Sequence, residues 1–78
     1  MKFKVYSIFD RAAQMFAEPW VAVNDVVAIR KFFQSCEGMS QAVAPDLQLF
    51  ALGEIDMNTG VISSSVEFIQ GYALKEGN

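Results

Sequence analysis

The stretch that most constrains the fold spans residues 47–62, LQLFALGEIDMNTGVI, because it indicates a strand, a turn and a second strand in direct succession. Apolar residues occupy both alternating sets of positions in residues 47–52, as in a strand that is covered on both faces. One cover is the core of the domain, and the other is a helix or a partner chain. Gly53 interrupts this arm and predicts a β-bulge or a close approach of two backbones.

The turn of this hairpin is predicted by residues 56–60, DMNTG. Asp56 and Asn58 can bond backbone groups two residues further on, and Gly60 can take a positive φ without steric cost. Val61 then resumes the apolar pattern. We therefore expect a hairpin whose loop has about five residues.

Two strands are expected before the hairpin and an apolar segment follows it. Residues 2–9 alternate in character as a half-buried strand does, and residues 19–23 form a shorter apolar run. Residues 11–18 between them are predicted as a turn or loop. Gly71 divides the apolar segment after the hairpin, so the tail at residues 64–78 is either a last strand or an extended arm that packs on a neighbouring subunit.

One helix is expected at residues 25–37, with Asn24 or Asp25 as its N-cap. Its predicted apolar arc comprises Val26, Ile29, Phe32, Phe33 and Cys36. The predicted fold is an α+β single domain over residues 1–78, with an antiparallel sheet of about four strands and one helix in the order β-β-α-β-β. A small closed barrel with a helix cap is the alternative, since many proteins that bind single strands are such barrels.

The hydrophobic content indicates self-association. Hydrophobic residues make up 53% of the 78 residues, and charged residues make up 19%. A chain of this length buries only about 60% of the surface that it exposes when unfolded, so a thin core has to hide many apolar side chains. We expect a homo-oligomer, most simply a twofold dimer, and the alternative is a compact monomer with an apolar surface.

Charge and residue content exclude several classes of site. A formal net charge of −3 argues against coating nucleic acid by bulk charge, while a local basic patch stays compatible with it. The chain has no histidine and one cysteine, so no intrachain disulfide can form and neither a zinc site nor another cofactor is expected. Without a long apolar run or a signal peptide, we expect a soluble cytoplasmic protein with no membrane attachment.

The first predicted strand carries the main candidate surface for nucleic acid. The face expected in the core holds Phe3, Val5, Ser7 and Phe9. The other face holds Lys2, Lys4 and Tyr6, beside Ile8. An aromatic ring among cations is suited to single-stranded DNA, because cations attract phosphates and the ring stacks on bases. The simpler interpretation is a solvated strand face whose lysines discourage edge pairing.

Other cations and aromatic residues complete the candidate set. Arg30 and Lys31 are the one adjacent pair of cations, and with Arg11 they either extend the DNA-binding face or solvate the surface. A lone tryptophan beside a proline is more typical of a core or interface anchor than of a base-stacking platform. The predicted interface residues are Trp20, Phe50, Phe68 and Tyr72.

Catalysis is not expected. Carboxylates occur at Asp10, Asp25, Asp46, Glu54 and Asp56, scattered among predicted turns and caps. Two-metal hydrolysis needs carboxylates that converge, and this spacing gives no sign of convergence. Cys36 lies on the apolar stripe of the helix and has no histidine to act as its base, so it is interpreted as a small buried hydrophobe.

A set of short motifs occurs in order along residues 1–62. It comprises Met1-Lys2, Tyr6, Ser7, Asp10, Pro19 before an aromatic residue, Asn24, Ala28, Arg30 and Phe32. It is most specific in Pro45-Asp46, Leu49-Phe50, Leu52-Gly53, Asp56 and Thr59-Gly60. In this order and spacing, the set resembles the small nonstructural protein of gokushoviruses, which are icosahedral single-stranded DNA phages of the microvirus family.

The resemblance implies a protein that is absent from the virion and acts in the cytoplasm of the bacterial host during viral DNA replication. It implies binding to single-stranded DNA in the switch from duplex replication to single-strand synthesis and packaging, and it supplies no catalytic motif. A homodimer would bring the few cations of two chains into one groove. The alternative is a homo-oligomeric interaction module that binds a phage replication or capsid protein, or a host factor, without touching DNA.

Overall fold

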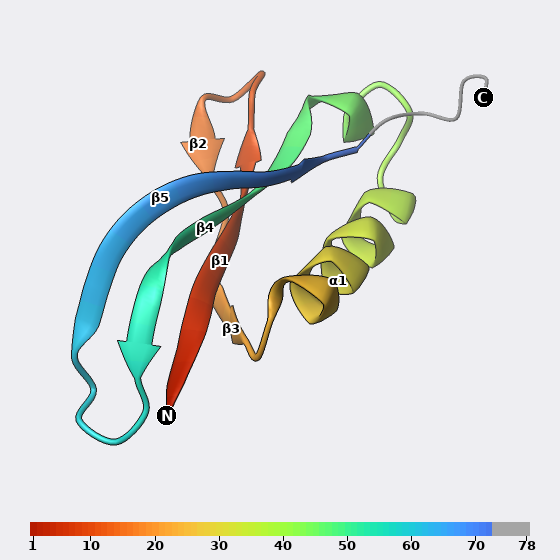
Figure 1. Cartoon of the computed structure of the whole chain (residues 1–78). Coiled ribbons are helices and arrows are strands. Elements are labelled where there is room, and N and C mark those ends of the chain that lie inside the picture. Colours follow the sequence, from red (N-terminus) through yellow and green to blue (C-terminus); the bar gives the residue numbers. More distant parts are fainter. Residues whose placement is uncertain (73–78) are drawn as a thin grey trace.

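The computed structural model describes residues 1–72, which form an α+β fold with one α-helix and an antiparallel sheet of five strands (Figure 1). The strands are β1 (Lys2–Asp10), β2 (Met15–Phe16), β3 (Trp20–Ala22), β4 (Leu47–Asp56) and β5 (Ile62–Gly71). The helix α1 spans Asp25–Glu37, and a 3₁₀ turn, η1 (Ala44–Asp46), leads into β4. The α+β prediction is confirmed, and the fifth strand is the short β2, which forms within the predicted loop at residues 11–18.

β1 is the strand around which the sheet is built. β4 pairs with it along its whole length, and β5 pairs with the far side of β4. β2 and β3 share the other edge of β1. Since β5 pairs only with β4 among the described strands, the sheet stays open and the alternative of a closed barrel is wrong.

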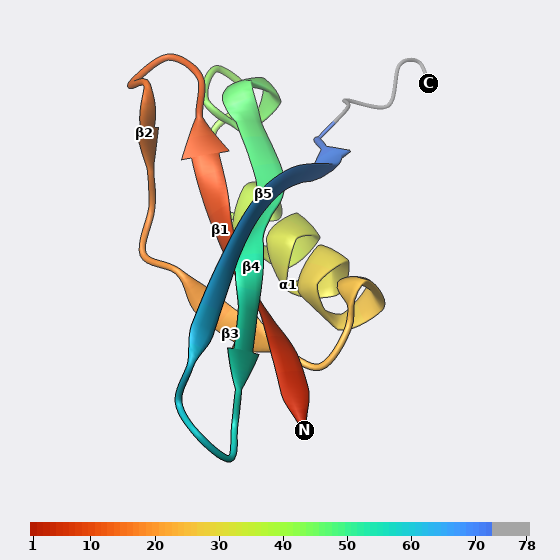
Figure 2. The same cartoon turned by 60° about the vertical axis from the view of Figure 1, so that its left-hand side comes forward.

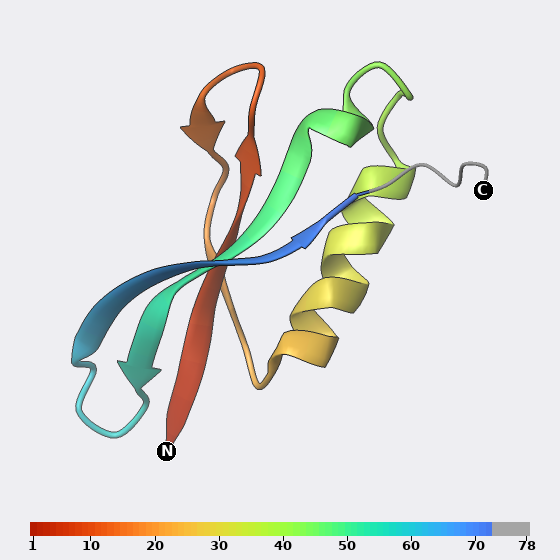
Figure 3. The ribbon, with the colours of Figure 1, turned by 45° about the horizontal axis from the view of Figure 1, so that its top comes forward.

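The hairpin forms as the turn residues predict. The backbone N–H of Gly60 donates to the Asp56 carbonyl at 2.7 Å, the N–H of Asn58 donates to the Asp56 carboxylate at 2.9 Å, and Gly60 has a φ of +81°. Figure 3 shows this turn beside the N-terminus, where the N–H of Met57 donates to the Met1 carbonyl at 2.8 Å. Residues 64–71 of the predicted tail belong to β5, and its remaining part from residue 73 lies outside the described residues.

The helix begins where its cap predicts. The Asn24 side chain accepts a hydrogen bond from the Val27 N–H at 3.0 Å, which satisfies one of the free donors of the first turn. The side of α1 that meets the sheet carries the buried residues Ala28, Phe32 and Cys36. Val26 was predicted on this arc but is 65% exposed, because it lies roughly 120° around the helix from Phe32 at the centre of the buried side. None of the helices in residues 1–72 has the length and apolar character needed to cross a membrane.

The core lies between α1 and one face of the sheet, which Figure 2 shows in front of the helix. Its sheet residues are Tyr6, Ala22, Leu47, Leu49 and Ala51. The small side chains of Ala22, Ala28 and Ala51 let the helix approach the strands closely.

The orientation of β1 reverses the prediction from its sequence. Tyr6 is fully buried under α1, and Lys4 lies on the same side, so the expectation that Phe3, Val5, Ser7 and Phe9 face this core is wrong. Both faces of β1 contain apolar residues, so alternation alone does not choose between them. Two features decide which side of β1 faces the helix: Asp25 at the start of α1 accepts a hydrogen bond from the Tyr6 hydroxyl, and the neighbouring strands present alanines on that side.

Candidate interaction surface

The side of the sheet away from α1 is apolar, and no helix of residues 1–72 packs on it, although the segment at Ala17 covers it locally over the buried Ser7. Directly paired residues share a face of a sheet. The register therefore puts Phe3, Ile55 and Ile62 in one row on this side, and Phe50 with Phe68 in another. We call this surface the phenylalanine face. Its apolar members are Phe3, Val5, Phe9, Phe16, Val21, Phe50, Ile55, Ile62, Val66 and Phe68.

Four phenylalanine rings from four strands contact one another on this face. The Phe9 and Phe16 ring centroids are 4.8 Å apart. The Phe50 ring lies between the rings of Phe16 and Phe68, with centroid distances of 5.5 Å and 5.6 Å, and both contacts are edge-to-face. Such pairs stabilise beyond the area that they bury. Yet Phe68 is 52% exposed and Phe16 is 43% exposed, so the cluster is formed but open to solvent.

The backbone around Phe16 holds it on this face. Ala17, which lies between β2 and β3, is bonded to β1 twice. Its carbonyl accepts a hydrogen bond from the buried Ser7 hydroxyl at 2.6 Å, and its N–H donates to the Ile8 carbonyl at 2.8 Å. Gln14 has a φ of +60°, a left-handed conformation that closes the turn from β1 into β2. The loop is therefore folded back along β1, which brings the Phe16 ring onto the Phe9 ring.

The phenylalanine face contains no charged residue. Its non-apolar positions in the paired strands are Ser7, Gln48, Gly53, Ser64 and Gly71. The carboxylates and lysines of these strands lie on the helix side instead, for example Lys4 opposite Glu54, and Lys2 opposite Asp56. The sheet thus separates an uncharged apolar side from a charged side.

On the charged side, a polar network ties β1 to the start of α1. The Tyr6 hydroxyl donates to the Asp25 carboxylate at 2.5 Å, and the Lys4 ammonium lies 3.2 Å from the same oxygen. The hydrogen bond from Tyr6 and the nearby Lys4 hold the pKa of Asp25 below its usual value. Burial and the Asp25 carboxylate raise the pKa of Tyr6 well above its usual value, so this phenol stays protonated and acts as a donor.

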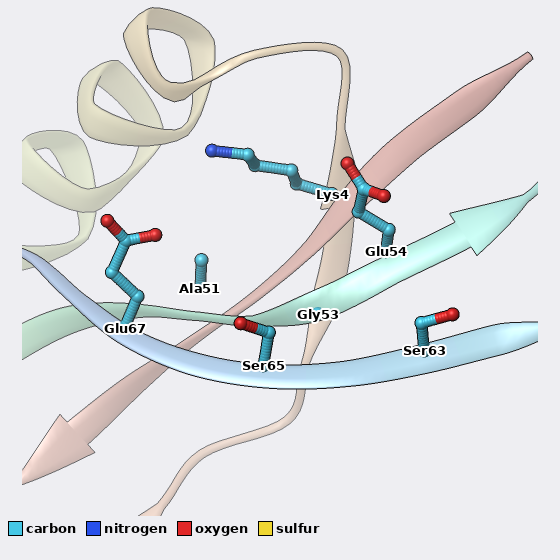
Figure 4. A pocket seen from close by; sticks show the side chains of 7 residues that line it. All are labelled: Lys4, Ala51, Gly53, Glu54, Ser63, Ser65 and Glu67. Atoms are coloured by element: carbon cyan, nitrogen blue, oxygen red, sulfur yellow. The ribbon is translucent and has the colours of Figure 1, made fainter.

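A shallow pocket lies next to this network and is shown in Figure 4. Its volume is about 260 Å³, and it is lined by Lys4, Ala51, Gly53, Glu54, Ser63, Ser65 and Glu67. The two glutamate side chains point to the same side of the strands as Lys4 (Figure 4). A phosphate group would meet two carboxylates here, and the lysine is already paired with Asp25. The pocket therefore does not suit nucleic acid.

The structure does not gather the predicted DNA-binding residues into one patch. Lys2 and Lys4 share the helix side of the sheet with acidic neighbours, and Arg11 lies exposed in the turn at the other end of β1. Arg30 and Lys31 are exposed on α1, where the Lys31 ammonium lies 4.8 Å from the centre of the Trp20 ring. The Tyr6 ring is fully buried, so in this fold it presents no open face on which a base could stack.

The four predicted interface aromatics divide between the two sides of the sheet. Phe50 and Phe68 belong to the phenylalanine face. Trp20 is half-buried against the core under α1, and its indole N–H is buried without a hydrogen-bond partner. Tyr72 packs on Phe33 with ring centroids 5.8 Å apart. Sequence reasoning assigned Phe3, Phe9 and Val5 to the core. The apolar character of both faces of residues 47–52 indicated a second apolar side of the sheet, but it did not show which residues of β1 lie on that side.

Two observations on the described residues concern metal binding and the reactivity of the cysteine. No group of three or more histidine, cysteine, aspartate or glutamate residues converges within residues 1–72. Cys36 is buried, and desolvation raises the pKa of its thiol to about 11, so it is a poor nucleophile at neutral pH. The chemistry available on the surface is therefore that of apolar contact on one side and of dispersed charge on the other.

Comparison with known proteins gives one match. A family model described as Phage ORF5 protein matches residues 3–72, nearly the whole chain. No curated protein and no solved structure matches.

Proposed function

The chain belongs to the phage ORF5 family, and on that premise we propose that it is a gokushovirus nonstructural protein that serves DNA replication in the host cytoplasm as a protein-binding module. The phenylalanine face is the binding surface in this proposal. The protein acts without catalysis and without a cofactor. Its place at the replication stage rests on the resemblance of its motifs to the gokushovirus protein.

The observation that carries the proposal is an uncovered sheet face without charge. Exposed apolar patches of this kind on small proteins mark binding sites, because water-exposed phenylalanine and isoleucine side chains gain free energy when a partner covers them. Phe16 and Phe68 together present two half-exposed rings on either side of Phe50. Buried aromatic anchors that are central to a patch carry most of the binding free energy in protein interfaces.

Single-stranded DNA binding is the second candidate, and the ring cluster itself favours it. An open antiparallel sheet with exposed aromatic residues is the platform on which some nucleic-acid-binding domains stack bases, at about 1–3 kcal/mol per base. Arg11, two residues beyond Phe9, is the cation nearest in sequence to these rings. The candidate stands second because phosphates need clustered cations, and the cations of β1 and α1 lie elsewhere.

The experiment compares the wild type with the double variant Val66→Thr/Phe68→Thr, which keeps strand-forming residues on β5 but removes apolar surface. Ser65→Thr, on the opposite side of the same strand, is the matched control. Each protein is tagged and expressed together with an untagged copy of the chain and with the phage replication and capsid proteins, and captured after nuclease treatment. A labelled oligothymidine is titrated in parallel at two salt concentrations, with anisotropy as the readout.

We expect the wild type and Ser65→Thr to retain a phage protein after nuclease treatment, and the double variant to lose it. The oligothymidine should bind weakly and with little dependence on salt. If the oligothymidine instead binds tightly, with an affinity that falls steeply with salt and is lost in the double variant, the face binds DNA and the second candidate replaces the first. Equal capture by all three proteins would contradict the protein-binding use of the face, and oligothymidine binding that the double variant leaves unchanged would contradict its use for DNA.

A further inference from the structure

We infer that the phenylalanine face binds a second copy of this chain, so that two sheets pack face to face around a twofold axis with the helices on the outside. The inference rests on the proposed use of this face for protein binding and names its partner. It draws on the charge of the face, its area and the positions of its aromatic rings.

Charge selects this face for self-association. In a twofold contact the same patch meets itself, so a charged residue near the axis would lie close to its own copy and repel it. Each chain has a net charge of −3, and the helix side of the sheet carries Asp25, Glu54, Asp56 and Glu67. Two copies that approached through the helix side would bring these carboxylates together. The phenylalanine face avoids this, because the residues placed on it by the register are uncharged.

The area of the face matches a small stable interface. Strands lie about 4.8 Å apart and rise about 3.3 Å per residue, so β1, β4 and β5, with the five residues of β2 and β3, give a footprint of roughly 550 Å² per copy. Two copies would bury roughly 1,100 Å², which is just above the area of about 1,000 Å² that a specific protein interface needs. A smaller segment, such as a single peptide strand or helix, would leave part of the face exposed.

The rings are arranged for sheet-on-sheet packing. Two sheets that pack face to face interdigitate their side chains across a gap of about 10 Å, with their strands rotated by about 30°. Phe50 lies near the middle of the face, and Phe16 and Phe68 stand on strands to either side of it. The half-exposed rings of one copy can fill the spaces beside Phe50 in the other. The result is a sandwich with a phenylalanine core.

The test measures the mass of the full chain by sedimentation equilibrium over a wide range of concentration. Phe68→Lys places a charge on the face at a side chain that is 52% exposed, so the monomer fold tolerates it. Ser65→Lys adds the same charge to the other side of β5, where the neighbours are Glu54 and Glu67. Circular dichroism checks the fold of each variant.

We expect the wild type and Ser65→Lys to have twice the mass of one chain, and Phe68→Lys to dissociate with at least a tenfold weaker affinity. As a second measurement on the wild type alone, dilution should shift the NMR signals of Phe16, Phe50 and Val66 and leave those of the outer side of α1 unchanged. This readout remains decisive if Phe68→Lys fails to fold.

Two results would overturn the inference. The first is a wild type that stays monomeric at the highest concentration; if its phenylalanine face still captures a phage protein after nuclease treatment, the proposed function stands and only the partner changes. The second is a dimer whose affinity is unaffected by Phe68→Lys and whose dilution shifts map to the unpaired edge of β5. Self-association would then proceed by edge pairing.

Discussion

Among the glycines of the sheet and its turns, Gly53 is the one at which replacement by alanine should lower the free energy of unfolding most. Its φ is +150°, and a Cβ built there would lie 2.1 Å from the Ser63 carbonyl oxygen and 3.0 Å from the Ser64 Cα. These are backbone atoms of β5, so no side chain can rotate out of the way. The pairing registers of β4 with β1 and with β5 both shift at this point. Gly53→Ala therefore forces β4 and β5 apart where β4 is also bonded to β1.

The expected cost follows from two contributions. A non-glycine residue in this region of φ costs about 1–3 kcal/mol. Moving β5 far enough to clear the methyl group weakens the ladder where Gly53 pairs with Ser64 and Glu54 with Ser63, at about 1 kcal/mol for each hydrogen bond lost. The free energy of unfolding should fall by about 3–5 kcal/mol, a large part of the roughly 4–12 kcal/mol typical for a chain of this length.

Urea denaturation followed by Trp20 fluorescence measures this loss, at one fixed protein concentration because self-association would otherwise change the apparent stability. Two other glycines supply controls. Gly60 has a φ of +81°, and no atom of residues 1–72 lies within 4 Å of a methyl group added there, so Gly60→Ala should cost about 1 kcal/mol from backbone strain alone. Among the same residues, a methyl group at Gly71 meets the Phe68 ring at 3.8 Å, and Gly71→Ala should be nearly neutral. A Gly53→Ala cost no larger than that of Gly60→Ala would refute the close approach of the two strands.

Two further predictions concern the helix side of the sheet. Tyr6→Phe removes the donor that stabilises the ionised Asp25, so it should lower the free energy of unfolding at pH 7 by about 1–2 kcal/mol. Because the folded pKa of Asp25 lies below its unfolded value, this contribution is present above the unfolded pKa and is lost as the pH falls through the folded pKa. The stability difference between wild type and variant, measured by urea titration, should therefore shrink as the pH falls through the folded pKa of Asp25; a difference that stays constant throughout the acid titration would contradict the ionic role of Asp25. Cys36 should react with a thiol reagent such as DTNB much more slowly in the folded protein than in urea at pH 8, because burial raises its pKa to about 11. Similar rates in both conditions would mean that the thiol is accessible.

The elements that depend on a few neighbouring residues were predictable from the sequence. The turn at residues 56–60, the cap of Asn24 on the helix and the close approach at Gly53 all form as their local signals predict. For the turn and the cap, a side chain or a permissive backbone acts within a few residues of itself, so the signal and its effect lie in the same short stretch. At Gly53 the signal is one residue, and the strand that it approaches follows through the adjacent hairpin turn. The hydrophobic content likewise indicated more apolar surface than one thin core can hold, and the phenylalanine face is part of that surface.

The tertiary structure decided which face of each strand became the core. β1 and β4 are apolar on both sides, and alternation gives two sets without saying which one meets the helix. The choice depends on Asp25, which lies 19 positions from Tyr6 and accepts a hydrogen bond from its hydroxyl group, and on alanines contributed by three different elements. The ring of Phe9 packs on that of Phe16, which lies in the two-residue strand β2. So short a strand within a loop has no recognisable pattern in the sequence. Contacts between distant segments therefore placed the expected core residues of β1 on the side away from the helix. Close packing of the helix requires small side chains and a hydrogen-bond partner for the Tyr6 hydroxyl, and the alternation of apolar residues in the sequence indicates neither requirement.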